Sequence, residues 1–226
     1  MSASLLHPAL RQSLFLAGTD TGVGKTTVAV ALLQRLAESG LRVAGMKPVA
    51  AGAAMTSHGW RNDDALDLLA AGNVQLPYEW VNPCCLPTGT SPHLAAREAG
   101  VQIEIAPILA AFDCIKTRSD LIIVEGAGGW LAPIGPGGPE ESHTMQDVAV
   151  ALGLPVVLVV GMRLGCLNHA LLTAGAIGRS GLPFAGWIAN PIDPGFADAE
   201  AYIDSLRSRL AAPLLWRALP GILPGQ

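Results

Sequence analysis

Several short stretches of this chain are apolar at almost every position, and this pattern constrains the fold more than any other feature of the sequence. The clearest are "DLIIVEG" at 120–126 and "PVVLVVG" at 155–161. Continuous runs of branched residues are typical of central strands in a parallel sheet that is covered on both faces. Shorter runs at 13–18, 42–46 and 184–190 predict three further strands.

Between these runs lie segments with the apolar spacing of amphipathic helices. We expect helices near 25–40, 64–71, 92–99, 105–116, 144–152, 167–180 and 197–210. The alternation predicts a doubly wound α/β fold, with a mostly parallel sheet and helices on both faces. We expect one domain over 1–226, with a loose N-terminal extension at 1–12 and a flexible loop at 135–142. Ligands of such folds bind where the parallel strands end, so residues just after the strands are the candidates for a site.

The composition agrees with a sheet that is buried on both faces, since 50% of the residues are hydrophobic and 14% are charged. The formal net charge is −4 and no two of the 14 Lys and Arg residues are adjacent, so we expect no nucleic-acid partner. The longest apolar stretch, 148–162, is interrupted by Gly153 and Pro155. It predicts a helix end, a turn and a strand, and we expect no membrane association.

The four cysteines are Cys84, Cys85, Cys114 and Cys166, and none forms a C-x-x-C pair. This spacing is a poor framework for disulfides or zinc, so we expect reduced thiols with a structural role. The N-terminal segment has no basic start followed by an apolar stretch, so no signal peptide is expected. These features together predict a cytoplasmic protein.

The segment "GTDTGVGKTT" at 18–27 lies between the first predicted strand and the first predicted helix. Its glycines allow the backbone to wrap around phosphate oxygens, and free N–H groups at a helix start favour anions. Lys25 would reach the β- and γ-phosphates and Thr26 would offer its hydroxyl to Mg²⁺, which predicts a P-loop NTPase-like fold that binds ATP. The usual spacing requires a glycine where Thr19 stands, and Gly18 comes one residue early. The alternative is a glycine-rich turn with a solvated lysine.

Two acidic residues are candidates for binding the metal. Glu125 directly follows the apolar run "LIIV" and precedes "GAGG", whose glycines would let the backbone approach a γ-phosphate. Its alternative is a solvated turn residue. Asp64 lies in "WRNDDALDLL", where Asn62 or Asp63 could cap a helix and Asp64 could be an ordinary first-turn acid.

Lys47 follows the predicted strand at 42–46, where it could stabilise the negative charge that develops during phosphoryl transfer. The alternative is an exposed surface lysine. Gly165, Cys166 and Asn168 stand at the start of a predicted helix, whose free N–H groups suit a carboxylate or phosphate. Every helix start has such groups, so an ordinary helix start is an equal alternative.

The segment "TSPHLAAREAG" at 90–100 has a simple structural explanation. Ser91 is placed to cap a helix and Pro92 to occupy its first turn. We therefore expect His93 to be packed or exposed rather than catalytic.

Taken in order, these motifs resemble the dethiobiotin synthase family, also called dethiobiotin synthetases, of the biotin pathway. The matching stretches are "GTDTGVGKT", "GMKPVAAG", "RNDDAL", "NP…TSPH", "VEGAGGW", "VVGMRLGCLNHALLTA" and "GWIAN". They run from residue 16 to about 190 in the family's order, followed by a weaker "APLL…LPGIL" tail. The phosphate loop of this family contains the same extra residue.

The resemblance implies an ATP-dependent cyclising ligase. In that reaction 7,8-diaminopelargonate forms a carbamate with CO₂, and ATP phosphorylates the carbamate to a carbamic–phosphoric anhydride. The second amine then closes the ureido ring of dethiobiotin and releases phosphate. Such chemistry depends on positioning and charge neutralisation more than on an acid–base pair.

The resemblance also implies roles for individual residues. It implies a triphosphate cradle of Gly22, Val23, Gly24, Lys25, Thr26 and Thr27, with Gly126, Ala127 and Gly128 beside the γ-phosphate. It implies Mg²⁺ ligands at Thr26, Asp64 and Glu125, and catalytic roles for Lys47, Lys25 and Thr21. It implies adenine-side contacts at Asn190, Pro191, Pro220, Gly221 and Ile222. In the homodimer that it implies, substrate would be held by Thr21, Lys47 and Ala51, and by Gly165, Cys166, Asn168 and Tyr202 of the other subunit.

One position departs from the family pattern. The segment "KPVAAG" has Ala51 where the family usually has a hydroxyl residue before its glycine. A neutral hydrogen bond of about 0.5–1.5 kcal/mol to substrate would be missing there, unless water or Ser57 supplies it.

Two other functions share parts of this pattern. Partitioning-type ATPase switches have the same fold and "GVGKT", but they usually carry a lysine where this chain has Asp20. The synthetase half of a cobyrinate-type amidotransferase is the other, but the chain is short for an added glutaminase domain, and no cysteine has a recognisable nucleophile context.

Overall fold

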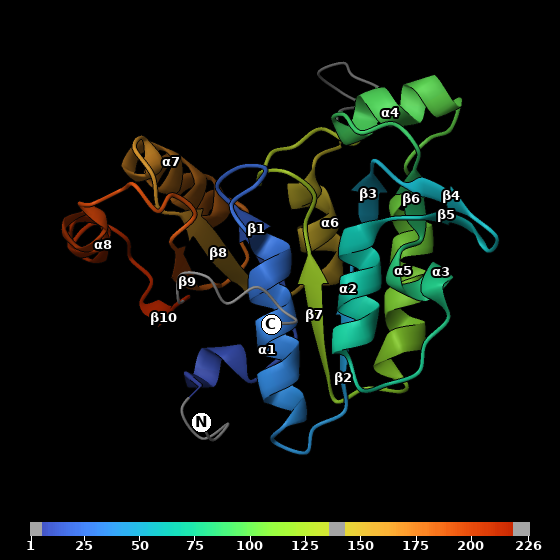
Figure 1. Ribbon diagram of the computed structural model, residues 1–226, viewed down its shortest axis with the longest axis horizontal. Coiled ribbons are helices and arrows are strands. Elements are labelled where there is room, and N and C mark those ends of the chain that lie inside the picture. Colours follow the sequence, from blue (N-terminus) through green and yellow to red (C-terminus); the bar gives the residue numbers. More distant parts are fainter. Residues whose placement is uncertain (1–5, 136–142, 219–226) are drawn as a thin grey trace.

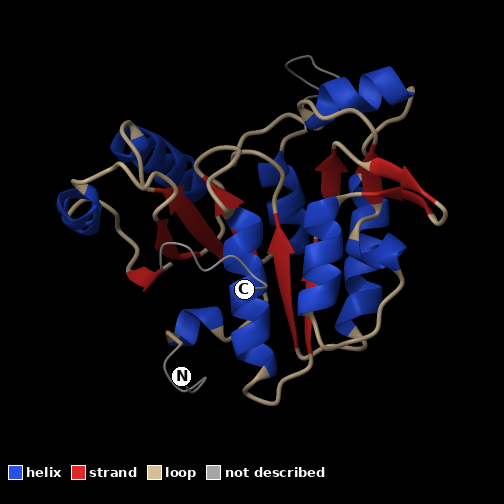
Figure 2. Ribbon diagram, viewed as in Figure 1, coloured by secondary structure: helices blue, strands red, loops and turns tan. Residues whose placement is uncertain are grey.

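Within its described residues, the chain forms a six-stranded parallel sheet. Figures 1 and 2 show this computed structural model, in which helices cover both faces of the sheet. The structure describes residues 6–135 and 143–218. The strand order is β10-β9-β8-β1-β7-β2 and every neighbouring pair is parallel. The strands are β1 (Leu14–Gly18), β2 (Val43–Met46), β7 (Leu121–Glu125), β8 (Val156–Gly161), β9 (Phe184–Asn190) and β10 (Leu214–Arg217). The predicted doubly wound, P-loop NTPase-like α/β fold is confirmed.

The helices that separate the strands also agree with the sequence pattern, within a few residues at each end. They are α1 (Lys25–Ala37), α2 (Asp63–Ala71), α4 (Pro92–Ala99), α5 (Ile105–Lys116), α6 (Met145–Leu152), α7 (Cys166–Arg179) and α8 (Ala199–Arg207). The four-residue helix α3 (Tyr78–Val81) was not predicted. The helices α1 and α2 lie on the near face of the sheet in Figure 1, and α5 and α6 lie behind it.

Alternate side chains of the strands enter two hydrophobic cores on opposite faces of the sheet. In β1, Leu14 and Leu16 pack in the core beside α1, whereas Phe15 and Ala17 pack in the core beside α5, α6 and α7. All five residues of β1 are buried, as are all six of β8. Burial on both faces is the physical reason why these strands are apolar at consecutive positions.

Three short pairings were not predicted. Two lie outside the main sheet: β3 (Val49–Ala51) pairs in parallel with β6 (Cys84–Leu86), and β4 (Ala54–Thr56) forms a hairpin with β5 (Gly59–Arg61). The third adds the edge strand β10 to the main sheet, beside β9. The three-residue strands carry too little periodicity to be recognised from sequence, and the four residues of β10 were not distinguished from the loop around them.

The segment before β1 packs more closely than we expected for an extension over 1–12. A short 3₁₀ helix, η2 (Pro8–Leu10), places Leu10 in the core beside α1, where it is fully buried. Residues 1–5 lie outside the described part of the chain, as do 136–142 of the predicted flexible loop.

The apolar stretch 148–162 divides as predicted. It contains the end of α6, a turn at Gly153 with a φ of 65°, and the buried strand β8. Within the described residues, no helix is both long and apolar enough to cross a bilayer.

Candidate active site

The loop between β1 and α1 is held in shape by glycines and by a side chain from β9. Gly22 and Gly24 have φ angles of 71° and 80°, in the region that L side chains rarely adopt. A Cβ atom at Gly24 would collide with the side-chain amide of Asn190. Asn190 ends β9, and its Nδ2 donates a hydrogen bond to the Val23 carbonyl oxygen 2.8 Å away. The predicted adenine contact Asn190 therefore lies directly against the phosphate loop.

Lys25 begins α1, and its side chain is buried at the centre of the site. Its Nζ donates hydrogen bonds to the carbonyl oxygens of Gly128, at 2.7 Å, and of Asp20, at 3.0 Å. Burial, and then the positive charge of Lys47, lowers the pKa of Lys25 to about 8. A buried ammonium whose partners are neutral carbonyls has much to gain from a phosphate oxygen, because charge-assisted hydrogen bonds are the stronger ones.

Lys47 is buried, so it is not the exposed surface lysine that was the alternative. Its Nζ donates hydrogen bonds to Glu125 Oε1 and to Asp64 Oδ2, the latter at 2.8 Å. Burial alone would lower the pKa of Lys47, but the two carboxylates outweigh it and raise the pKa above its ordinary value. The Lys47 ammonium therefore lies between the ends of β2 and β7, beside two carboxylates that favour its charged form.

The capping interpretation of "RNDD" is confirmed, whereas the metal-binding role of Asp64 stays a prediction. Asn62 caps α2, because its side chain accepts a hydrogen bond from the Ala65 N–H over 3.3 Å. Asp64 stands in the first turn, and its carboxylate faces Lys47. Burial would raise the pKa of Asp64, but Lys47 lowers it below its usual value. Asp64 is thus part of the charged cluster as well as a helix-start acid.

Glu125 is almost completely buried at the end of β7, so it is not a solvated turn residue. Its Oε1 accepts hydrogen bonds from Lys47 and from the Thr26 hydroxyl, which is 2.9 Å away. Its buried Oε2 has no hydrogen-bond partner within the described part of the chain. Burial raises the pKa of Glu125 while Lys47 opposes the shift. A buried unpaired carboxylate oxygen is costly, so Oε2 marks a position where a cation would be stabilised.

The oxygen atoms around Glu125 Oε2 are suitable ligands for a Mg²⁺ ion that binds together with a nucleotide. Across residues 6–135 and 143–218, no group of three or more His, Cys, Asp or Glu side chains could hold a metal ion. Thr26, Asp64 and Glu125 offer one hydroxyl and two carboxylates instead. Mg²⁺ in nucleotide sites commonly takes one or two carboxylates and completes its octahedron with phosphate oxygens and water.

Two cavities adjoin this charged cluster. The loop cavity, of about 460 Å³, is lined by the phosphate loop and the start of α1, with the exception of Val23, whose side chain is buried in the core. The side cavity, of about 410 Å³, is lined mainly by the segments around Ala51, Asn62 and Thr90. Four residues line both cavities: Thr21, Lys47, Asp64 and Gly128. The charged cluster therefore forms the boundary between two spaces large enough for small molecules.

Sequence reasoning missed three of the six polar or charged residues that line the side cavity. Asn62, Thr90 and Ser91 line it. Ser91 does stand at the N-cap position of α4, but its hydroxyl bonds His93 Nδ1 at 3.0 Å instead of capping the helix. The hydroxyl residues Thr90 and Ser91 of "TSPH" are the sequence signal for this cavity. Ser91 was assigned to helix capping alone, so this signal was not used.

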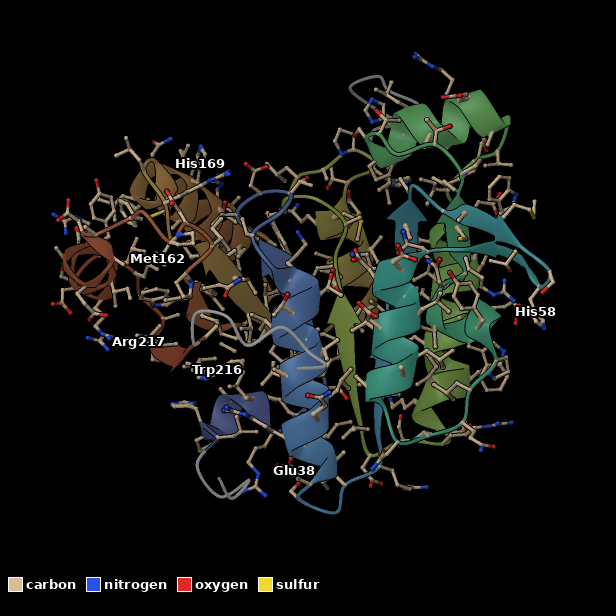
Figure 3. All side chains as sticks on the ribbon, in the orientation of Figure 1. Glu38, His58, Met162, His169, Trp216 and Arg217 are labelled. Atoms are coloured by element: carbon tan, nitrogen blue, oxygen red, sulfur yellow. The ribbon has the colours of Figure 1, made fainter. Side chains whose placement is uncertain are left out.

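The expected replacement for the hydroxyl missing at Ala51 is not near the side cavity. Ser57 lies in the turn of the β4–β5 hairpin, where its hydroxyl contacts His58 at 3.1 Å. Figure 3 shows His58 at the outer tip of this hairpin. The hydroxyl residues that line the cavity with Ala51 are Thr21, Thr90 and Ser91.

The remaining predicted residues lie elsewhere. Gly165 precedes α7 with a φ of 95°; Cys166 is buried and Asn168 is exposed on that helix. Tyr202 is on α8 and packs edge-on against Phe196. None of these residues lines either cavity. Pro191 follows Asn190, whereas Pro220, Gly221 and Ile222 lie outside the described residues.

Comparison with known proteins bears directly on the identity of this site. A family profile described as an AAA domain matches residues 12–219. The ATP-dependent dethiobiotin synthetase BioD of Xanthomonas axonopodis pv. citri is 49% identical over 95% of this chain and 91% of its own length. That of Aromatoleum aromaticum is also 49% identical, over 93% of this chain and 89% of its own length.

The chain belongs to the dethiobiotin synthetase family. The resemblance read from the motifs is thereby confirmed, and it extends over nearly the whole sequence. The glycines, lysines and carboxylates described above are therefore the candidate active site of a dethiobiotin synthetase family member.

Solved structures with low sequence identity share the fold of this dethiobiotin synthetase family member. A ParA family ATPase from Chlorobium tepidum matches with a TM-score of 0.55 and 15% identity, over 93% of this chain and 86% of the other. The MinD cell division protein of Aquifex aeolicus matches with a TM-score of 0.54 and 17% identity, over 90% and 80% of the two chains. At such identities the likeness concerns the fold alone.

Proposed function

We propose that this chain is an ATP- and Mg²⁺-dependent ligase that closes the ureido ring of dethiobiotin from 7,8-diaminopelargonate and CO₂, releasing ADP and phosphate. The observation that carries the proposal is the shared boundary of the two cavities. A phosphoryl donor in the loop cavity and an acceptor in the side cavity would meet at Thr21, Lys47, Asp64 and Gly128. Holding both reactants at such a boundary supplies much of the catalysis in phosphoryl transfer.

The loop cavity is the proposed site of the triphosphate. Gly22 to Thr27 supply backbone N–H groups at the start of α1, and Lys25 would exchange its two carbonyl partners for phosphate oxygens. Thr26, Asp64 and Glu125 would hold Mg²⁺, which supplies charge neutralisation of the phosphates when bound. Gly126, Ala127 and Gly128 follow β7 beside the γ-phosphate position.

The side cavity is the proposed site of the diamine. One amine attacks CO₂, loses a proton and becomes a carbamate; a carbamate oxygen then attacks the γ-phosphorus, and the bond to the ADP oxygen breaks. The second amine attacks the carbamoyl carbon, the bond to the phosphate oxygen breaks, and the amine proton leaves with the phosphate, so that the ring is closed. Lys47, buried and charged at the boundary, would stabilise the carbamate and the oxygen charge that develops during transfer.

Further contacts follow from family membership. We propose that Asn190, Pro191, Pro220, Gly221 and Ile222 contact the adenine side of the nucleotide. We also propose a cytoplasmic homodimer, in which Gly165, Cys166, Asn168 and Tyr202 of one copy hold the substrate carboxylate bound by the other. The four cysteines are free, in keeping with a reducing compartment.

The alternative function is a partitioning-type ATPase switch, whose fold is similar. Such proteins usually have a lysine where this chain has Asp20, and that lysine reaches across their dimer. Here the Asp20 carboxylate bonds Arg163 of the same chain. The aspartate at this position, where the switches usually have a lysine, favours the ligase.

The deciding experiment supplies the purified protein with diaminopelargonate, bicarbonate and MgATP, and measures dethiobiotin by mass spectrometry. We expect product, and ADP in equal amount, only when all three substrates are present. Folded protein that makes no dethiobiotin would disprove the proposal, and ATP turnover without diaminopelargonate would favour the ATPase switch.

A further inference from the structure

Asp20 connects the phosphate loop to a distant part of the chain. Its Oδ2 accepts a hydrogen bond from Arg163 Nη2 at 2.7 Å, and its Oδ1 accepts one from the Thr21 N–H, also at 2.7 Å. Its backbone carbonyl accepts the hydrogen bond from Lys25 Nζ. One residue thus links Arg163 to both Thr21 and Lys25.

Arg163 comes from the turn between β8 and α7, and that turn is itself held on both sides. The N–H of Met162 donates to the Asn190 carbonyl at 2.7 Å, and the N–H of Cys166 donates to the Arg163 carbonyl at 3.1 Å. The backbone that carries Arg163 is therefore tied to β9 and to the start of α7. The Arg163 guanidinium therefore contacts the phosphate loop from a backbone segment that hydrogen bonds hold in place.

Neither Asp20 nor Arg163 lines the loop cavity or the side cavity, whereas Thr21 lines both and Lys25 lines the loop cavity. We propose that Arg163 and Asp20 form a positioning pair: Arg163 anchors the Asp20 carboxylate, and Asp20 in turn places Thr21 and Lys25 at the boundary between nucleotide and substrate. This inference rests on the proposed function and deepens it, because it assigns a positioning role to Arg163 and Asp20, which act through Thr21 and Lys25.

The exposure of the pair separates a positioning role from a stabilising one. The side chains of Arg163 and Asp20 are 40% and 46% exposed, and ion pairs that water reaches contribute little to stability. Loss of the pair should therefore change the reaction rate much more than the melting temperature.

The chain provides a matched control in Arg42 and Asp120. Their side chains form an ion pair at 2.6 Å and are 61% and 39% exposed. They precede β2 and β7, so they lie at the amino ends of the strands, opposite the site. Arg42→Gln removes an arginine from a comparable surface pair without touching the phosphate loop.

The experiment compares Arg163→Gln, Asp20→Asn, the double variant and Arg42→Gln in the whole protein. Steady-state kinetics give kcat and KM, calorimetry gives the Kd of a nonhydrolysable ATP analogue with Mg²⁺, and thermal melting gives stability. We expect kcat to fall about tenfold to a hundredfold in either single variant, because small misplacements of reacting groups have effects of this size. We expect weaker analogue binding in both, and no further loss in the double variant, because residues that act as a unit are non-additive.

The pair has no positioning role if Arg163→Gln matches Arg42→Gln in kcat and analogue Kd, or if the two single losses simply multiply in the double variant. A fall in rate that parallels a fall in melting temperature would also overturn the proposal. If the unmodified protein makes no dethiobiotin, the proposed function fails on its own. The pair is then judged by analogue binding alone. The Kd must rise in Arg163→Gln and in Asp20→Asn, rise no further in the double variant, and remain unchanged in Arg42→Gln.

Discussion

The ammonium of Lys47 and the carboxylate of Asp64 lie 2.8 Å apart at the boundary of the two cavities. The same ammonium contacts Glu125, so one lysine is paired with both carboxylates that are proposed to hold Mg²⁺. If Asp64 and Glu125 held Mg²⁺, their negative charge would be shared with the metal ion, and the Lys47 ammonium would be available to substrate. Lys47 should therefore matter for the chemical step more than for nucleotide binding.

Lys47→Ala should abolish turnover while leaving the affinity for MgATP nearly unchanged. Removal of one charge-stabilising group commonly lowers kcat by about 10²–10³. Stopped assays give kcat, and calorimetry gives the nucleotide Kd. Lys116→Ala, which removes an exposed lysine at the end of α5, is the control and should behave as the unmodified protein. An equal loss of affinity and rate would make Lys47 a nucleotide-binding residue instead.

Glu125→Gln should remove most of the effect of Mg²⁺ on nucleotide affinity. Glutamine keeps an acceptor for Lys47 and Thr26, but it lacks the negative charge that a divalent cation requires. Titrations with ADP and the nonhydrolysable analogue, with Mg²⁺ and with EDTA, measure this effect. Asp113→Asn, which neutralises an exposed acid on α5, should leave it intact. Glu125 is not a metal ligand if the variant retains the magnesium dependence of the unmodified protein.

The central strands were predictable from sequence because their environment leaves a local signal. Every position of β8 is buried, so every position is apolar, and no tertiary information is needed to see it. The three-residue strands β3 and β6 lack such a signal. Their pairing, with Val49 opposite Cys84, joins segments that are far apart in sequence.

The candidate site was predictable where chemistry follows directly after a strand or begins a helix. Lys25 and Glu125 belong to this class. Asp64 was ambiguous, because a capping residue and a first-turn acid look alike in sequence; only the structure shows that Asn62 does the capping. The contact between Asp20 and Arg163 joins residues 143 positions apart, so no local sequence pattern predicts it.

Gly24→Ala should prevent nucleotide binding. The φ of 80° at this position costs an L residue about 1–2 kcal/mol, and the new Cβ would also collide with the Asn190 amide that holds the loop. Gly40→Ala is the matched control, because Gly40 has a φ of 84° but no atom lies within 4 Å of where its new Cβ would stand. Both variants should lose stability through the backbone, and only Gly24→Ala should lose affinity for the nucleotide. Similar nucleotide Kd values in the two variants would contradict the role assigned to the Asn190 contact.

Cys84→Ser should reduce the decrease in the free energy of unfolding that we expect as the pH rises above 9. Burial, and then the neighbouring Cys85, raises the pKa of Cys84 from 9.0 to about 11. The folded protein then holds this proton at pH values where the unfolded chain has released it, so the free energy of unfolding falls as pH rises from 9 to 11. Urea titrations across this pH range measure the slope. Serine has no ionisation there, so the variant should show a smaller slope than the unmodified protein, and equal slopes would show that Cys84 does not contribute.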